Sequence, residues 1–148
     1  MNSDAKDFVI DKNGTITGYS GSGGDVVIPP EIGGIAVRAI AERVFVQKNL
    51  TSVVIPAGVE KIGEGAFAEN KLVKTVIPDN VTVGRWAFMD NEEKGENLIS
   101  EVTIGNNVTH LAVRNGHNFP TFYEAKKRKA GTYIFDEAKG TWCEKNRH

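Results

Sequence analysis

Cysteine is almost absent from this sequence. Cys143 is the single cysteine in 148 residues, so the chain cannot form an intrachain disulfide or a zinc cluster of several cysteines. Neither sign of charge dominates, because 18 basic residues stand against 19 acidic ones. Nucleic-acid binding normally depends on a basic excess that neutralises phosphates. We therefore expect no nucleic-acid partner for this chain.

Long apolar runs are missing as well. No stretch approaches the ~20 apolar residues of a membrane-spanning helix, and no membrane insertion is expected. The first residues lack the apolar core of a signal peptide. If the natural protein is exported, its export signal is expected in a longer precursor. The residues alone leave the compartment unknown.

Glycine, in contrast, is abundant. Sixteen glycines in 148 residues exceed the usual share of about 7%, which favours a fold with many tight turns. The apolar fraction of 40% and the charged fraction of 25% are typical of a globular protein. The length fits one domain that covers residues 1–148.

A repeated apolar motif divides the middle of the chain into four units. Each unit has a short segment of alternating apolar residues that ends in isoleucine. These segments cover residues 26–28, 52–55, 74–77 and 101–104, and we expect them to be adjacent parallel strands of one sheet. A unit of this size cannot bury its apolar side alone, so neighbouring units must stack. The spacing predicts a β-dominated solenoid with residues 26–111 as its repeats.

The apolar residues of each unit are interpreted as core. Alternate side chains of a strand point to opposite faces, so the strand isoleucines are expected to stack in an inward column, with a phenylalanine of each unit behind them. These residues are Ile28, Ile55, Ile77 and Ile104, and Phe45, Phe67 and Phe88. Short helical turns are predicted around the phenylalanines, over residues 41–47, 64–68 and 84–89.

The two ends of the chain differ from the repeats and are expected to be caps. Residues 1–25 contain Asn13 and Gly14 between two apolar alternations, which predicts a β-hairpin. Residues 112–148 are predicted to form a helix over 119–129 and a second hairpin from residues 131–135 and 141–143.

The second unit resembles the BspA-like leucine-rich repeat. The matching positions are Val53, Val54, Ile55, Pro56, Val59, Ile62, Gly63, Ala66, Phe67, Asn70 and Leu72. The opening residues 14–29 are similar to the start of such repeat arrays. The closing residues 122–142 are similar to the terminal segment of spirochaete members. The resemblance covers nearly the whole chain and implies a leucine-rich-repeat solenoid.

The resemblance also implies a role. Proteins of this family are bacterial surface or secreted proteins that attach to host matrix components, to other bacteria or to surfaces, and no catalytic residues come with the family. The third residue after the phenylalanine is often cysteine in the family, but here it is Asn70, Asn91 or, in the first unit, Lys48. An asparagine amide can bond loop backbone groups that the coils leave unpaired.

Motifs that could carry chemistry are weak. The glycines at 21–24 run into a strand, which favours a plain turn over a phosphate loop. His110 and His117 have no third ligand at coordination spacing, and the acidic residues at 90–96 do not match a calcium loop. The basic residues at 126–129 are interpreted as a solvated surface. We expect no enzyme activity, no cofactor and no metal. An enzyme that uses the acidic loop or His110 is the least favoured alternative.

One row of residues is a candidate binding site. With the isoleucines inward, four side chains point outward in a row, and four polar residues run beside them. The row is Val27, Val54, Val76 and Thr103, beside Asp25, Ser52, Lys74 and Glu101. An apolar stripe rimmed by polar residues is typical of a protein-binding surface. The sequence favours a module that binds a protein or glycan partner there. The alternative is a structural or self-assembling repeat with no ligand of its own.

Overall fold

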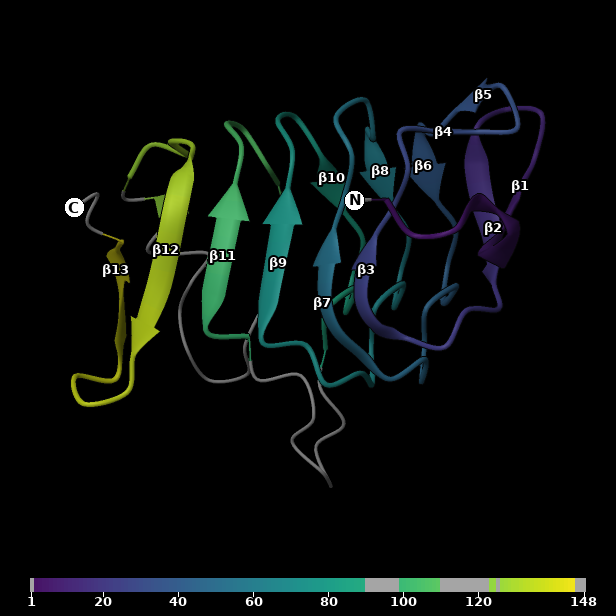
Figure 1. The fold of residues 1–148 in the computed structure, drawn as a ribbon. Coiled ribbons are helices and arrows are strands. Elements are labelled where there is room, and N and C mark those ends of the chain that lie inside the picture. The colour runs from purple at the N-terminus through teal and green to yellow at the C-terminus, as the bar shows by residue number, and fades with distance from the viewer. Residues whose placement is uncertain (1, 90–98, 110–122, 125, 146–148) are drawn as a thin grey trace.

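The protein is a short β-solenoid whose coils stack side by side (Figure 1). The computed structural model describes residues 2–89, 99–109, 123–124 and 126–145. Each repeat contributes one longer strand to one side of the coil. The first three repeats also contribute a two-residue strand to the other side, and the fourth contributes a single bridge from Thr109 to Thr82. No helix in the described part of the chain is long and apolar enough to cross a membrane.

The longer strands form the predicted parallel sheet. They are β3 (Gly24–Val27), β7 (Leu50–Val54), β9 (Lys74–Ile77) and β11 (Glu101–Ile104), which pair in that order. Each neighbouring pair is parallel, and Val26, Val53, Thr75 and Val102 are partners in register. Ile28 lies one residue beyond β3, yet its N–H still donates to the Val54 carbonyl at 3.0 Å. The prediction of adjacent parallel strands is confirmed.

A second sheet on the other side of the coil was not predicted. It orders β1 (Phe8–Ile10), β2 (Thr15–Tyr19), β6 (Ala39–Ile40), β8 (Lys61–Ile62) and β10 (Thr82–Val83). The expectation of a single parallel sheet was therefore wrong. The repeat strands of this sheet are two residues long, which is too short for an alternating apolar pattern to show in the sequence.

The first unit carries an insertion that forms its own small hairpin. Strands β4 (Glu31–Ile32) and β5 (Ile35–Ala36) pair antiparallel through Gly33 and Gly34. Both glycines have positive φ, 57° and 84°, which a two-residue hairpin turn of this type requires. The extra residues of this unit thus leave the stacking of the coils unchanged.

The core lies between the two sheets. The inward column is buried as predicted, and the three repeat phenylalanines stack face to face behind it. Ring centroids of Phe45 and Phe67 lie 4.9 Å apart at an interplanar angle of 12°, and those of Phe67 and Phe88 lie 5.2 Å apart at 10°. Phe8 and Tyr19 continue the aromatic cluster into the N-terminal cap.

The segments around the phenylalanines are turns in which no residue is helical, so the helical geometry predicted there is absent. Within them the N–H of Phe45 donates to the carbonyl of Ala66 in the next coil at 2.8 Å, and that of Phe67 donates to Ala87 at 2.7 Å. Backbone groups that a helix would pair internally are thus used to join neighbouring coils. These bonds make the turns into a third stacked side of the solenoid, which we call the turn face.

Both predicted hairpins are present at the caps. At the N-terminus β1 and β2 are antiparallel, preceded by a short 3-10 turn over Ala5–Asp7. At the C-terminus β12 (Gly131–Asp136) and β13 (Thr141–Glu144) are antiparallel. Because β12 also pairs with β11, the hairpin extends the main sheet, as Figure 1 shows.

The helix predicted over residues 119–129 is not supported. Tyr123 and Glu124 are helical, residues 119–122 and 125 lie outside the described residues, and residues 126–128 form turns. Lys127 and Arg128 have φ of 57° and 54°. Left-handed backbone at two successive residues ends any helix, although the charged residues there have good helix propensity.

Asn70 bonds the loop backbone as the sequence predicted. Its side chain is buried, and Oδ1 accepts the N–H groups of Lys48 at 3.0 Å and Leu50 at 3.1 Å. Its Nδ2 donates to the carbonyl oxygens of Phe45 at 2.7 Å and Phe67 at 3.0 Å. The amide therefore ties two neighbouring coils together where their turns lead into the strands. Asn91 lies outside the described residues.

Candidate interaction surface

The outward row of the main sheet is continuous over four strands. Val27, Val54, Val76 and Thr103 are direct partners in register, and each is half-buried. The residues on either side of them along the strands, Val26 and Ile28 for example, are buried. The alternation read from the sequence therefore has the correct phase. We call these four residues, with the polar row beside them, the strand face.

The polar row is paired within the protein. Asp25 accepts hydrogen bonds from Ser52 Oγ at 2.7 Å and from Thr51 Oγ1 at 2.9 Å. Glu101 lies 3.7 Å from Lys74 Nζ and 2.9 Å from Lys145 Nζ. Opposite charges thus meet along the row, and the apolar row lies beside it.

These contacts hold both carboxylates in the ionised form. The hydrogen bond from Ser52, with that from Thr51, lowers the pKa of Asp25 below its ordinary value. The hydrogen bond from Lys145 lowers the pKa of Glu101, against a smaller opposing effect of burial. At neutral pH the strand face therefore keeps its charge pairs.

A shallow depression lies in the middle of the strand face. It has a volume of about 320 Å³ and is lined by Asp25, Thr51, Ser52, Val53, Val54, Val73, Lys74 and Val76. Val73 is 51% exposed, and among the described large apolar residues only Val9 is more exposed. Sequence reasoning missed it because it lies just before the start of β9, where strand alternation does not apply. The apolar pair Leu72 and Val73 was the signal available.

The C-terminal hairpin enlarges the strand face, which the sequence did not predict. Thr132 of β12 is the partner of Thr103 of β11, and their hydroxyl oxygens lie 2.9 Å apart. Ile134 is the partner of Glu101 and is half-buried. Sequence reasoning treated the hairpin as a separate cap and so left these residues out.

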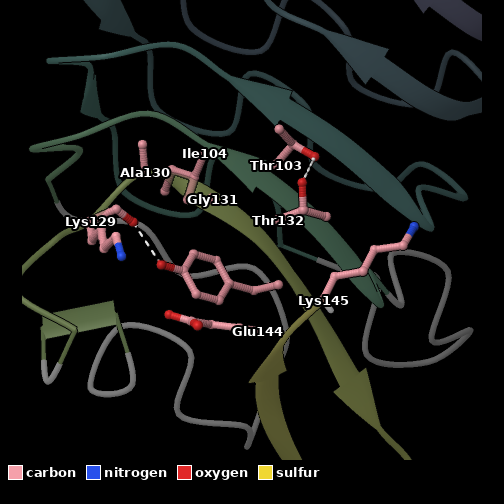
Figure 2. Close-up of a pocket in the computed structure, with 9 residues that line it drawn as sticks. Thr103, Ile104, Lys129, Ala130, Gly131, Thr132, Glu144 and Lys145 are labelled. Atoms are coloured by element: carbon pink, nitrogen blue, oxygen red, sulfur yellow. Dashed lines mark hydrogen bonds between the residues drawn. The ribbon is translucent and has the colours of Figure 1, made fainter. Parts of the chain in front are cut away.

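A larger depression of about 800 Å³ lies where β11 ends and β12 begins. Its lining is Thr103, Ile104, Lys129, Ala130, Gly131, Thr132, Tyr133, Glu144 and Lys145. Figure 2 shows Thr103 and Thr132 facing each other, with Lys145 and Lys129 on opposite sides of the view. The Tyr133 hydroxyl donates to the Lys129 carbonyl at 2.7 Å, and burial raises the pKa of this tyrosine.

The structure adds little support for a functional role of the weaker sequence motifs. The glycines at 21–24 lead into β3, as expected. The acidic residues 90–96, His110 and His117 lie outside the described residues. Within the described ranges no three His, Cys, Asp or Glu side chains come together to hold a metal. In the basic segment, Arg128 pairs with Glu124 at 2.8 Å and Lys126 with Glu144 at 4.0 Å.

The stacked coils correspond to the repeats of a known family. The BspA type leucine rich repeat region matches residues 38–114 in six copies, a little more than half of the chain. The chain belongs to the BspA-type leucine-rich repeat family. This family is typically non-enzymatic. No curated protein gives a significant match to the chain.

One solved structure is similar to this leucine-rich repeat protein. It is a leucine-rich cell surface protein from Faecalibacterium prausnitzii A2-165, 32% identical, with a TM-score of 0.48. The match covers 66% of this chain and 30% of that chain. The chain thus spans less than a third of that protein's length.

Proposed function

We propose that this protein is an interaction module without catalytic activity that binds a protein or glycan partner across its strand face. The observation that carries the proposal is the unbroken outward row from Val27 to Thr103, held in register by four hydrogen-bonded strands. A rigid surface loses less conformational entropy on docking than a loop does, and so gives more net affinity for each contact.

The chemistry of the strand face supports contact with another macromolecule. An apolar centre with a polar rim is the usual anatomy of a binding patch. Here Val54, Val76 and the exposed Val73 form the centre. Asp25 and Glu101 on the rim already have partners, so a ligand gains affinity mainly by covering the apolar residues.

Membership of the family supports a cellular location for this binding. BspA-type repeat proteins are surface or secreted proteins of bacteria, and attachment is the role that the family implies. We therefore place the module at the bacterial cell surface, where its partner would be a host matrix protein, a component of another bacterium or a glycan.

Solid-phase binding tests the proposal directly. The purified chain is applied to immobilised extracellular matrix proteins and to a glycan array, beside the double variant Val54→Lys, Val76→Glu. Because both side chains face outward and are only half-buried, we expect the double variant to fold and to lose binding. Surface changes of this kind usually alter stability by under about 0.5 kcal/mol.

A matched control places the same charges on the second sheet. Thr17 and Thr82 lie on β2 and β10 and are exposed, so Thr17→Lys with Thr82→Glu should bind as the parent does. Equal binding by the parent and the strand-face variant would contradict the proposal, and so would a parent that binds nothing on either panel.

A further inference from the structure

The turn face carries a second surface, on a different side of each coil from the strand face. Arg43, Gly65 and Trp86 occupy equivalent places in three consecutive coils, because the N–H of Arg43 donates to the Glu64 carbonyl at 3.1 Å and that of Gly65 to the Arg85 carbonyl at 3.0 Å. All three have left-handed backbone, with φ of 57°, 62° and 59°. Only the middle coil has a glycine there.

This arrangement leaves a notch in the turn face. Gly65 and Ala68 are small and form its floor, while Arg43 stands on one side and Trp86 on the other. The notch has a volume of about 230 Å³, enough for one long side chain but not for a folded element. A Cβ added to Gly65 would lie 3.4 Å from Cγ of Arg43, so the floor is closely bordered on that side.

Trp86 is an unusual residue for this position. Its side chain is 51% exposed, although the ring could bury a large apolar area elsewhere. Its positive φ costs about 1–2 kcal/mol for a residue with a Cβ, a cost that glycine avoids. The side chain therefore contributes little to the core and is held in an unfavourable backbone state. Exposed tryptophans at the centre of a patch are frequent anchors of binding.

Charge indicates what the notch accepts. Three carboxylates border it, those of Glu42, Glu64 and Glu69, against two guanidiniums, that of Arg43 in the lining and that of Arg85 over the Trp86 ring. In the described part of the chain Glu42 and Glu64 form no ion pair, and Glu69 accepts from Gln47 Nε2. The lining thus carries a negative excess around an aromatic wall.

The indole ring already holds one cation. Cζ of Arg85 lies 5.2 Å from the centroid of the Trp86 ring, which is within the range of a cation–π contact. This contact uses part of the ring, and about half of the side chain stays exposed. The neighbouring notch offers a second approach to the ring, together with carboxylates to pair with an incoming charge.

We propose that this notch binds a lysine or arginine side chain from an extended basic segment of a protein partner. The aliphatic stem packs against Trp86 and the floor at Ala68, and the charged end lies among the carboxylates of Glu42, Glu64 and Glu69. A surface on the turn face is independent of the strand face, so one can fail without the other.

The test uses a labelled nonapeptide with lysine at alternate positions in a glycine and serine background, and a matched peptide with norleucine in place of lysine. Binding to the full chain is measured by fluorescence anisotropy at low ionic strength. We expect the lysine peptide to bind and the norleucine peptide to bind at least tenfold more weakly. Trp86→Gly should weaken binding of the lysine peptide at least threefold, and Trp86→Phe should weaken it less.

Variants of the rim separate this site from general charge attraction. Glu64→Gln with Glu42→Gln should weaken binding of the lysine peptide at least threefold. Glu31→Gln, a change at an exposed glutamate of β4, should have no effect on binding. Thermal unfolding checks that Trp86→Gly folds, and its midpoint should equal or exceed that of the parent, because glycine relieves the backbone cost at this position.

Several results would overturn the proposal. Equal binding of the lysine peptide by the parent and by Trp86→Gly would show that the notch is not the site. Equal binding of the lysine and norleucine peptides would show that charge is not recognised. A neutral oligosaccharide that needs Trp86 while the lysine peptide does not bind would assign the notch to a glycan. A parent dimer that Trp86→Gly dissociates, with no peptide binding, would assign it to a second copy of the chain.

Discussion

Asn70 provides the sharpest test of how neighbouring coils are joined. The change Asn70→Ala removes five hydrogen bonds, because Oδ1 accepts two backbone N–H groups and Nδ2 shares its two hydrogens among three carbonyls. Lys48 is half-buried, so its backbone N–H can form a hydrogen bond to water instead. The N–H of Leu50 and the carbonyls of Phe45 and Ala68 belong to buried residues and lose this partner.

The expected loss follows from those three groups. A buried polar group left without a partner costs about 1–3 kcal/mol, so three of them near the lower limit lower the free energy of unfolding by about 3–5 kcal/mol. A domain of this kind has about 5–15 kcal/mol in total. The variant should therefore be folded only marginally at room temperature.

Urea unfolding followed by circular dichroism measures this change. We expect a lower midpoint with an unchanged slope, because the surface exposed on unfolding stays the same. Asn2→Ala, at an exposed position, is the control and should change the free energy by under ~0.5 kcal/mol. Asn70→Cys should lose less than Asn70→Ala, since a thiol is a weak donor and acceptor. A loss of under about 1 kcal/mol for Asn70→Ala would contradict this prediction, because water would then have replaced the amide.

Three further predictions concern the core, the coil contacts and pH. Phe67→Ala should lower the free energy of unfolding by ~3–5 kcal/mol, measured by the same assay, and a loss under 1 kcal/mol would mean that the ring is not core. Gly63→Ala places a Cβ 2.6 Å from the backbone nitrogen of Glu42, and the forced separation of two coils should cost ~1–3 kcal/mol; a neutral change would contradict this close contact. Asp25 and Glu101 have pKa values lowered in the folded state from 3.8 and 4.5, so their stabilisation is present above those values and is lost as the pH falls through the folded values. The thermal midpoint should fall with pH in that acidic range, and Asp25→Asn with Glu101→Gln should flatten the fall; equal slopes would contradict it.

The sequence predicted the main sheet and its face because a strand's alternation is local. Val53 and Ile55 flank Val54, and that pattern alone fixes which side chain points outward. Exposure at Trp86 could not be predicted, because it depends on what the next coil places beside the ring. The second sheet was missed for a different reason. A strand such as Lys61–Ile62 is defined by its partners in neighbouring coils, not by its own residues.

The helix predicted over residues 119–129 shows where local propensity misleads. Residues 126–129 are charged side chains that suit a helix, yet Lys127 and Arg128 have left-handed backbone. The Tyr123 hydroxyl accepts the N–H of Val108 at 3.2 Å and lies 3.0 Å from the carbonyl oxygen of Arg128. This contact with the last repeat fixes the segment in a turn, so tertiary packing overrides local propensity.

The stacked rings of Phe45, Phe67 and Phe88 also bear on how such a surface can change in length. Each ring meets an equivalent ring in the next coil at nearly the same spacing, so the contact between coils is the same wherever it occurs. A duplicated coil would find a matching neighbour on both sides. Each duplication would widen the main sheet by one strand, about 4.8 Å. The breadth of the surface can therefore evolve in discrete steps without any redesign of the packing beneath it.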